Sequence, residues 1–306
     1  MLKMTRRTAS KLLSVGTGAL FLKQLPKLEI NKTMNHRIIP STNEKLPVVG
    51  LGTWQTFDVG SSAEDRAPLK EVLKILVEHG GSVIDSSPMY GRSEKVVGEL
   101  TTELNIKQPL FEATKVWTSG KEAGMQQMNT SIDLMQAKPM DLMQIHNLVD
   151  WKTHLSTLKE WKEAGKIRYI GITHYHKGGY EEVEKIMRSE TIDFVQINYN
   201  LLVREAAERI LPLAKDKGIA VLINRPYAGG SLFRLSKNKI FPAWAAEFDA
   251  KTWGQLFLKF ILANPAVTCV IPGTSKAKHM RDNVQAGFGS LPDIEQQQKL
   301  IKLLAN

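Results

Sequence analysis

The sequence predicts an α/β protein built as a (β/α)8 TIM barrel, with an N-terminal β-hairpin before the barrel and a long loop after strand 7. Three observations support this fold class. Strand-like runs recur eight times, mostly at intervals of about 25 to 35 residues, which is the rhythm of alternating strands and helices. The segments between these runs show helical periodicity. Several runs are apolar throughout, such as I-A-V-L-I at 219–223, as expected for a parallel sheet buried on both faces.

The eight strand-like runs give the order of the predicted strands, and a hairpin precedes them. The runs are residues 48–52, 82–85, 111–115, 141–145, 167–172, 193–197, 219–223 and 267–271. Residues 37–39 and 45–46 flank the turn-rich stretch P-S-T-N, and this pattern predicts the hairpin.

Apolar stripes at helical spacing predict the helices between the strands. One stripe is formed by Leu69, Val72, Leu73 and Leu76, and similar stripes begin at Trp151 and at Trp253. Residues 224–251 contain no clear helix, and we interpret this long loop as a flap over the barrel mouth. The residues after Pro292 are expected to form a terminal helix beyond the barrel.

The formal net charge of +10 comes largely from the N-terminus. Residues 1–30 contain six basic side chains and one acidic side chain, whereas the remainder contains 35 basic and 30 acidic residues. The remainder has no dense run of lysine and arginine with interleaved aromatic residues, so we expect no nucleic-acid partner.

Residues 1–30 have the organisation of a targeting segment. Arg6, Arg7 and Lys11 precede an uncharged run of 11 residues at 12–22, which is too short for a stable membrane span but suits the apolar region of a signal. The segment resembles a twin-arginine export signal. This resemblance implies a periplasmic location; the alternative is a disordered basic tail on a cytoplasmic protein.

Cys269 is the only cysteine and lies in the apolar run V-T-C-V-I. The chain therefore forms no intramolecular disulfide, and we expect a buried core thiol. The predicted organisation is a signal-like segment at 1–30 followed by one barrel at 36–306.

Three successive predicted strands end on an ionisable residue. They end on Asp85, Lys115 and His146, and Tyr90 follows the first of them on the next loop. Because the carboxyl ends of parallel barrel strands meet at one mouth, where active sites lie, these four residues are the candidate catalytic residues. The structural alternative is a buried Asp85–Lys115 ion pair, a tyrosine in the cavity wall and a core histidine.

Seven motifs, in order, resemble those of the aldo-keto reductase superfamily over nearly all of residues 48–292. They are G-L-G-T-W (50–54), D-S-S-P-M-Y-G (85–91), A-T-K-V-W (113–117), Q-I-H-N (144–147), G-K-I-R-Y-I-G-I-T (165–173), Q-I-N-Y-N (196–200) and I-P-G-T-S (271–275). The resemblance implies an NAD(P)H-dependent oxidoreductase that reduces an aldehyde or ketone to an alcohol. The expected cofactor is NADPH, or NADH in its place. We expect a small-molecule carbonyl substrate and a monomer without a stable membrane span.

By this resemblance Asp85, Tyr90, Lys115 and His146 match the catalytic tetrad of the superfamily. Hydride transfer to a carbonyl carbon leaves an alkoxide, which would take its proton from Tyr90. A free phenol has a pKa of about 10 and is a reluctant donor at neutral pH. Lys115 would lower that pKa by stabilising the phenolate, and Asp85 would hold the ammonium in place. His146 would hydrogen-bond the carbonyl oxygen.

The resemblance also implies contacts to the nicotinamide end of the cofactor. Gln196 matches the side chain that binds the carboxamide. Thr173 and His174 stand where the superfamily usually has Ser-Asn, so His174 is a departure from the pattern. Asn224 stands where an aromatic ring usually stacks on the nicotinamide.

The adenosine end is matched by residues after the last strand. Thr274, Ser275 and Lys276 match the segment near the adenosine phosphate. His279 stands where an arginine is common, and Asn283 matches a residue near the adenine. These residues are candidates for cofactor binding.

Aromatic and basic residues near the predicted mouth complete the candidate site. Trp54, Trp117 and Trp151 are candidates for the substrate pocket. Arg225 is a further cofactor-binding candidate, and Tyr227 could supply the stacking ring.

Two other function classes stay open. His174 and His176, with His146 and Asp85, could form the metal shell of a barrel metallohydrolase, although this leaves the lysine and tyrosine of the tetrad without a role. Bound zinc without nicotinamide binding would identify that class. The other class is a nucleotide-binding sensing or interaction module with little turnover, which would bind the cofactor without reducing carbonyl compounds. No metal is expected for the reductase.

Overall fold

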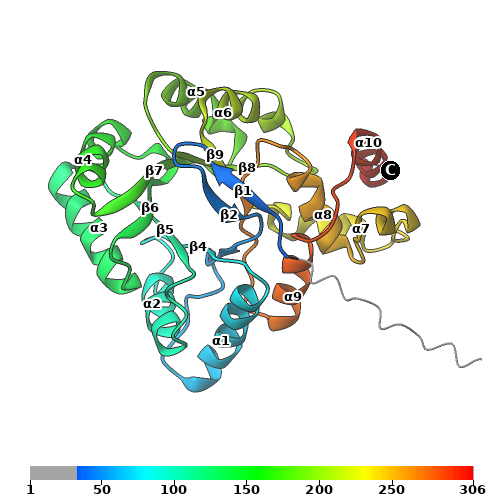
Figure 1. The fold of residues 1–306 in the computed structure, drawn as a ribbon, viewed down its shortest axis with the longest axis horizontal. Coiled ribbons are helices and arrows are strands. Elements are labelled where there is room, and N and C mark those ends of the chain that lie inside the picture. Colours follow the sequence, from blue (N-terminus) through cyan, green and yellow to red (C-terminus); the bar gives the residue numbers. More distant parts are fainter. Residues whose placement is uncertain (1–32, 306) are drawn as a thin grey trace, which may run out of the picture. The chain divides into compact units, whose positions relative to one another are not determined.

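The computed structural model describes residues 33–305, which contain an eight-stranded parallel barrel (Figure 1). Neighbouring strands follow the order of the chain, and every neighbouring pair is parallel. Isolated bridges between Val49 and Val270 and between Gly52 and Gly273 close the barrel. The strands are β3 (Leu51–Gly52), β4 (Val83–Asp85), β5 (Phe111–Val116), β6 (Met140–Ile145), β7 (Ile167–Thr173), β8 (Phe194–Asn198), β9 (Ala220–Asn224) and β10 (Cys269–Val270). The predicted TIM barrel is confirmed.

Helices connect the strands and pack around the outside of the barrel (Figure 1). The helices are α1 (Ala63–Glu78), α2 (Ser93–Glu103), α3 (Lys121–Met135), α4 (Trp151–Glu163), α5 (Tyr180–Ser189), α6 (Ile210–Lys217), α7 (Ser231–Ser236), α8 (Trp253–Leu262), α9 (Ala277–Gln285) and α10 (Ile294–Ala305). The apolar stripe predicted for α1 is buried. This helix begins where Ser62 Oγ accepts a hydrogen bond from Asp65 N at 3.1 Å, which satisfies one of the free amides of the first turn. The predicted terminal helix is α10.

The first and last barrel strands are shorter than predicted. β3 covers two residues of the predicted run 48–52, and β10 covers two residues of 267–271. The other residues of these runs still approach one another, because Gly50 N donates to Val270 O and Val270 N donates to Val48 O, both at 2.9 Å. The barrel therefore closes through single bridges instead of a continuous ladder.

The expectation that residues 224–251 contain no helix is wrong. This connection holds α7 and a 3-10 helix at Ala243–Phe248. Leu232, Ala245 and Phe248 are buried in the main hydrophobic core, so the connection is packed on the barrel and is not a free flap. Its residues that line the mouth all lie between 224 and 233.

The predicted hairpin is confirmed as β1 (His36–Ile39) paired antiparallel with β2 (Glu44–Pro47). Its side chains Ile39 and Leu46 join the apolar cluster inside the barrel. The hairpin therefore closes the amino-terminal end of the barrel, opposite the mouth.

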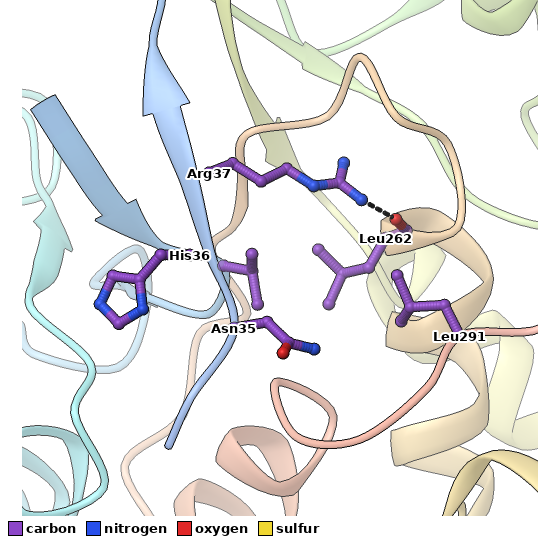
Figure 2. A pocket seen from close by; sticks show the side chains of 6 residues that line it. Asn35, His36, Arg37, Leu262 and Leu291 are labelled. Carbon is purple, nitrogen blue, oxygen red and sulfur yellow. Dashed lines mark hydrogen bonds between the residues drawn. The ribbon is translucent and has the colours of Figure 1, made fainter. Parts of the chain in front are cut away.

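Arg37 of the hairpin attaches this end to the last turn of α8. Its guanidinium donates to the backbone oxygens of Leu262 and Val267, and to that of Asn264 at 2.6 Å; Figure 2 shows the bond to Leu262. The Leu262 carbonyl is in the last turn of α8, and the carbonyls of Asn264 and Val267 follow it before β10. The cation therefore satisfies backbone acceptors at and just beyond the helix end. The cavity of about 240 Å³ beside Arg37 is thus built around a structural contact.

The barrel interior has an apolar layer with a polar layer above it, toward the mouth. The apolar layer includes Val83, Ala113, Leu142, Phe194 and Leu222. Two residues later, the same strands carry Asp85, Lys115, Gln144, Gln196 and Asn224. Because side chains alternate along a strand, these polar residues face the same interior as the apolar ones. This second layer forms the floor of the mouth.

Among residues 33–305, no helix has the length and apolarity needed to cross a membrane. The predicted export segment, residues 1–30, lies outside the described residues.

Candidate active site

A cavity of about 830 Å³ opens at the carboxyl ends of the barrel strands. Every strand end contributes to its wall, for example Thr53, Tyr90, Trp117, His146, Thr173, Gln196, Asn224 and Gly273. Of the four predicted catalytic residues, Asp85, Tyr90 and His146 line the cavity, and Lys115 is fully buried in contact with Asp85. The mouth of a parallel barrel is where ligands bind, so this cavity is the candidate active site.

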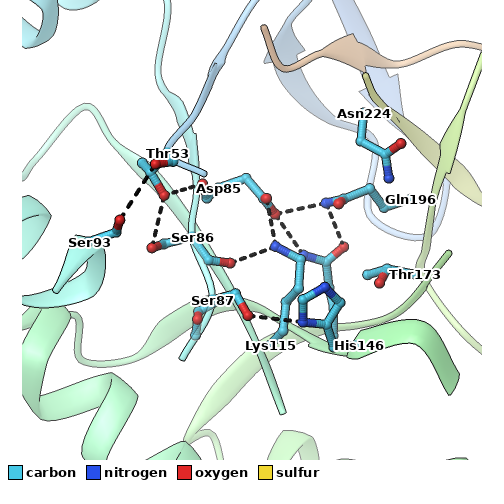
Figure 3. Close-up of polar contacts among 12 residues, drawn as sticks. Thr53, Asp85, Ser86, Ser87, Ser93, Lys115, His146, Thr173, Gln196 and Asn224 are labelled. Carbon is cyan, nitrogen blue, oxygen red and sulfur yellow. Dashed lines mark hydrogen bonds and ion pairs between the residues drawn. The ribbon is translucent and has the colours of Figure 1, made fainter. Parts of the chain in front are cut away.

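Asp85 and Lys115 form a buried ion pair in the polar layer (Figure 3). Lys115 Nζ lies 2.6 Å from Asp85 Oδ2 and also donates to Ser86 O at 2.6 Å. Burial lowers the pKa of Lys115, but the charge of Asp85 and the phenol of Tyr90 outweigh burial, and the pKa is raised above its ordinary value. Lys115 is therefore charged at neutral pH.

Tyr90 lies beside this ammonium, with its ring centroid 4.9 Å from Lys115 Nζ. Burial raises the pKa of Tyr90, the charge of Lys115 lowers it, and the charge of Asp85 raises it again, so the net pKa is raised. The expectation that Lys115 gives Tyr90 a lowered pKa is thus wrong for the net value. The ammonium acts in the predicted direction, but burial outweighs it.

His146 begins a 3-10 turn, η1 (His146–Leu148), at the end of β6. Its Nδ1 lies 3.0 Å from Ser87 Oγ, and its ring packs edge-on against Tyr90 at 5.9 Å between centroids. Burial, followed by the charges of Lys115 and His174, lowers the pKa of His146 to about 3. The imidazole is therefore neutral at physiological pH and offers one N–H and one lone pair.

Two glutamines complete the shell around Asp85. Asp85 Oδ1 accepts from Gln144 Nε2 at 3.0 Å and from Gln196 Nε2 at 2.7 Å; Figure 3 shows Gln196 directed at this carboxylate. Gln196 Nε2 also lies 3.2 Å from Gln144 Oε1. Asp85 thus accepts hydrogen bonds on both oxygens, and a side chain outside the predicted site contributes one of them.

The residues predicted to contact the nicotinamide are only partly brought together. Those that line the cavity are Thr173, Gln196, Asn224 and Arg225. His174 does not line it: a Cβ added to Gly179 would lie 2.3 Å from the His174 ring, so the ring fills the space that this glycine leaves. The same ring contacts His176 O through Nδ1 at 3.1 Å. His174, the departure from the family pattern, therefore does not line the cavity in this structure.

The candidates for the adenosine end lie after β10, in the turn before α9 and on α9 itself, and do not line the cavity. They are Thr274, Ser275, Lys276, His279 and Asn283. Thr274 Oγ1 accepts from Lys276 N at 3.1 Å, which fixes the turn into α9. Tyr227, on the cavity wall, donates to Asn283 Oδ1 at 2.6 Å. This bond connects the cavity to the predicted adenosine segment.

Exposed cations gather at the start of α9. Lys276, Lys278 and Arg281 are exposed, and none of them forms an ion pair with an acidic residue within residues 33–305. Burial and the charges of Lys278 and Lys276 lower the pKa of His279, although Asp282 opposes this. Within residues 33–305, these three cations therefore carry positive charge that no ion pair neutralises.

Large apolar side chains form the rim of the cavity. The rim residues are Trp54, Met89, Trp117, Tyr175 and Phe233, each 38% to 48% exposed. Trp54 and Trp117 were predicted for the pocket. The prediction for Trp151 is wrong, because this residue packs against the core at the start of α4 and donates from its indole to Glu182 Oε1 at 3.2 Å.

Sequence reasoning missed several residues of the site. Gln144 could have been found, because it lies two residues after the interior residue Leu142 and must share its face. Ser87 stands in the quoted D-S-S-P-M-Y-G motif, but nothing in that motif indicates a bond to the histidine. Asn147 lines the cavity in the left-handed region, with φ of 53°, and Phe233 belongs to the connection that was expected to lack a helix.

The chemistry of the cavity fits a nicotinamide dinucleotide. Gln196 Oε1 has no hydrogen-bond partner among the described residues and can accept a bond from a ligand. The cations at α9 can bind phosphate groups. Residues 33–305 contain no group of three or more His, Cys, Asp or Glu side chains placed to hold a metal ion. Asp85, which the metallohydrolase interpretation needs as a ligand, is instead occupied by lysine and glutamine donors.

Comparisons with known proteins agree with this arrangement. Residues 48–301 match the sequence model of the Aldo/keto reductase family. Among curated proteins, it is 28% identical over 205 residues to the aldo-keto reductase YhdN of Bacillus subtilis, a match that covers 62% of this chain and 61% of that protein. It is 25% identical over 249 residues to the methylglyoxal reductase YeaE of Escherichia coli, which covers 79% of this chain and 86% of that one.

Solved structures share the fold. An aldo-keto reductase from Klebsiella pneumoniae, determined in complex with NADPH, superposes with a TM-score of 0.74 at 22% identity, and the match covers 89% of this chain and 95% of that chain. At 22% identity this similarity shows a shared fold. The chemistry of the cavity depends on the side chains that line it in this protein.

Proposed function

The chain belongs to the aldo/keto reductase family, and from this premise we propose that it reduces the carbonyl group of a small aldehyde or ketone, with hydride from NADPH and a proton from Tyr90. The observation that carries the proposal is the contact of Tyr90 with His146 on one side and with the Lys115 ammonium of the buried Asp85–Lys115 pair on the other, at the floor of one open cavity. NADPH supplies the hydride when it is bound; the protein must orient the carbonyl and deliver the proton.

Tyr90 is the proposed proton donor. Its raised pKa keeps the phenol protonated at neutral pH, so the proton to be donated is present before the reaction. The Lys115 ammonium stabilises negative charge on the phenolate as the proton leaves, which lowers the barrier to donation. Asp85 keeps that ammonium in place within 2.6 Å, in an interior where a single cation would be costly.

His146 is the proposed orienting residue for the carbonyl oxygen. With a pKa of about 3 it stays neutral, so it does not compete with Tyr90 as the acid. When Nδ1 accepts the hydrogen bond of Ser87, the ring proton is on Nε2. Nε2 can then donate to the substrate. This tautomer gives the substrate oxygen two donors, a phenol and an imidazole.

The proposed cofactor contacts follow the wall of the cavity. Gln196 and Thr173 would bind the carboxamide end, and the cations at the start of α9 would bind the adenosine phosphate. We propose NADPH over NADH by a margin of order 1–2 kcal/mol, which is the value of one charge-assisted hydrogen bond.

The apolar rim supports a carbonyl compound with an apolar or aromatic body. Five large side chains at the rim remain 38% to 48% exposed, and a ligand that covers them gains about 25 cal/mol for each Å² of apolar surface removed from water. We expect kcat/KM to be higher for aromatic aldehydes than for small hydroxylated ones.

The test is NADPH oxidation by the purified full chain with a panel of aromatic, aliphatic and hydroxylated carbonyl compounds. Tyr90→Phe should lower kcat by at least about 100-fold and leave the Kd for NADPH unchanged, because only the proton donor is removed. Tyr169→Phe, which removes a phenol at the opposite end of the barrel, is the matched control and should retain turnover.

The outcomes separate the function classes. Wild-type turnover by Tyr90→Phe would refute the assignment of the donor. Tight NADPH binding without turnover of any carbonyl compound would support a sensing module of the same fold instead.

A further inference from the structure

We infer that Gln144 is a positioning residue that, together with Asp85, fixes the side-chain amide of Gln196 so that its oxygen is presented to the nicotinamide carboxamide. The inference rests on the proposed function, because it names how this chain would recognise its cofactor. It assigns a role to a side chain that would touch neither the substrate nor the cofactor.

The hydrogen bonds of the three side chains form a closed triangle. Gln144 Nε2 donates to Asp85 Oδ1 at 3.0 Å, and Gln196 Nε2 donates to the same oxygen at 2.7 Å. Gln196 Nε2 also donates to Gln144 Oε1 at 3.2 Å. Each edge of the triangle is thus one bond, and no edge involves a main-chain atom.

The chemistry of the carboxylate sets the direction of every bond. Ionised Asp85 only accepts, so both glutamines must turn their nitrogen toward it. The Gln196 amide has two N–H groups, and the triangle uses one for Asp85 and one for Gln144. Gln196 Oε1, which has no partner among the described residues, is then the one hydrogen-bonding atom that this amide can offer to a ligand. The cavity therefore presents an acceptor here and not a donor.

Gln144 can reach this position because the neighbouring strand carries a glycine. Gln144 on β6 pairs in register with Gly171 on β7. A Cβ added to Gly171 would lie 2.9 Å from Gln144 Cγ, closer than real Cβ contacts allow. All three members of the triangle are buried, so a lost bond cannot be replaced by bulk water.

An acceptor at this point selects a ligand that brings an N–H group. The nicotinamide carboxamide has an NH₂ group, and the 3-acetylpyridine analogue of the cofactor has a methyl group in its place. We expect the full chain to bind NADPH roughly five- to tenfold more tightly than reduced 3-acetylpyridine adenine dinucleotide phosphate, which is the value of one hydrogen bond.

The Gln144→Met variant keeps the volume and removes both bonds that this side chain makes. One N–H of Gln196 then loses its acceptor, so the amide can present a donor as well as an acceptor to the ligand, and the ratio of the two Kd values should fall to within about twofold of one. Because Met leaves the Asp85–Lys115 pair intact, the kcat of the saturated variant should change less than its cofactor Kd. Binding is measured by quenching of tryptophan fluorescence and by calorimetry, so the readout is independent of turnover.

Two further variants keep the inference testable if Gln144→Met is poorly folded. Gly171→Ala retains Gln144 but adds a methyl group that displaces its side chain. The ratio of the two Kd values should therefore fall in this variant as well. Gln144→Glu keeps a carboxyl oxygen that can accept from Gln196 Nε2 in either protonation state, so its ratio should stay close to that of the wild type. A merely structural role for Gln144 predicts no such difference between the methionine and glutamate variants.

The results separate this inference from the proposed function. If the wild type binds NADPH and its analogue equally, or if the ratio is unchanged in Gln144→Met and Gly171→Ala, the positioning role is refuted while the reductase proposal stands. If the wild type binds neither nucleotide, the proposed function fails and the inference fails with it. A ratio that is high in the wild type and lost in Gln144→Met and Gly171→Ala supports the inference.

Discussion

Nζ of Lys115 lies 2.6 Å from Oδ2 of Asp85, and the two side chains are 0% and 3% exposed. An ion pair this deeply buried adds little net stability compared with apolar residues of the same volume, yet removing one partner leaves an isolated charge in the interior. The pair therefore links the chemistry of the site to the stability of the barrel.

Lys115→Met should lower both activity and stability. The variant lacks the cation that stabilises the phenolate of Tyr90, so we expect a loss in kcat of at least about 100-fold. It also leaves Asp85 buried without its partner, which costs about 3–5 kcal/mol of unfolding free energy. Denaturant unfolding followed by circular dichroism measures the second effect.

The double variant Asp85→Asn with Lys115→Met separates the two effects. Removing both charges should restore at least about half of the lost unfolding free energy, while activity stays low. If the double variant is less stable than Lys115→Met, the pair is not the source of the penalty. Recovered turnover in either variant would contradict the role given to the ammonium.

His146 should make the protein less stable in acid. Its pKa is lowered to about 3 in the folded protein, against about 6.5 when unfolded, so the unfolded chain binds more protons between these values. The stability from the neutral imidazole is complete above pH 6.5 and is lost as the pH falls toward 3. At pH 5 the loss is about 2 kcal/mol, since each pH unit is worth about 1.4 kcal/mol.

The measurement compares the unfolding free energies of the wild type and His146→Asn at pH 7.5 and pH 5. The variant should lose about 2 kcal/mol less than the wild type between these values. His36→Asn, on the exposed side of the hairpin, is the matched control and should show the wild-type change. Identical pH dependence in wild type and His146→Asn would show that the histidine is not buried in its neutral form.

Lys276→Ala should weaken NADPH binding and leave NADH binding nearly unchanged. The side chain is exposed at the start of α9 and has no acidic partner within residues 33–305, so its charge is available for the 2′-phosphate. We expect an increase of about 5- to 30-fold in the Kd for NADPH, corresponding to 1–2 kcal/mol. Fluorescence titration of both cofactors provides the measurement.

Lys299→Ala, an exposed lysine on α10, is the control for a general charge effect. Because burial and two lysines lower the pKa of His279, any increase in NADPH preference from its protonation should appear below pH 6.5. Equal losses for both cofactors in Lys276→Ala would mean that this lysine does not read the 2′-phosphate.

We propose that residues 1–30 direct export of the folded protein across a bacterial inner membrane. The proposal is supported by Arg6 and Arg7 before a short uncharged run. Replacing both arginines with lysine should retain the protein in the cytoplasm, as measured by fractionation and immunoblotting. The same fractionation after replacing Lys3 and Lys23 with arginine is the matched control. Unchanged export of the twin-lysine variant would refute this location.

The strand ends could be predicted because they combine two independent patterns. Asp85, Lys115 and His146 each lie at the end of a strand-like run, and the geometry of a parallel barrel places the ends of such runs at one mouth. The same alternation that places Leu142 in the interior also places Gln144 there, so the missed glutamine was accessible to this reasoning.

Other parts of the site could not be predicted because they depend on packing across the fold. His174 turns away from the cavity because Gly179 leaves space for its ring, and Trp151 packs on the core beside Glu182. The raised pKa of Tyr90 depends on the balance between burial and a neighbouring charge, and neither can be read from the sequence. The helical turns after β9 are short and lack an apolar stripe of useful length, so periodicity does not reveal them.

Cys269 offers a way to observe the barrel opening. It is the only cysteine, lies in β10 opposite Leu222 of β9, and is fully buried in the interior cluster. Burial strongly raises the pKa of its thiol, so the folded protein presents almost no reactive thiolate. A thiol-alkylating reagent should therefore label the chain only when the seam near β10 separates. The rate of labelling in native buffer then measures how often the strands near β10 separate, and bound cofactor should slow the labelling.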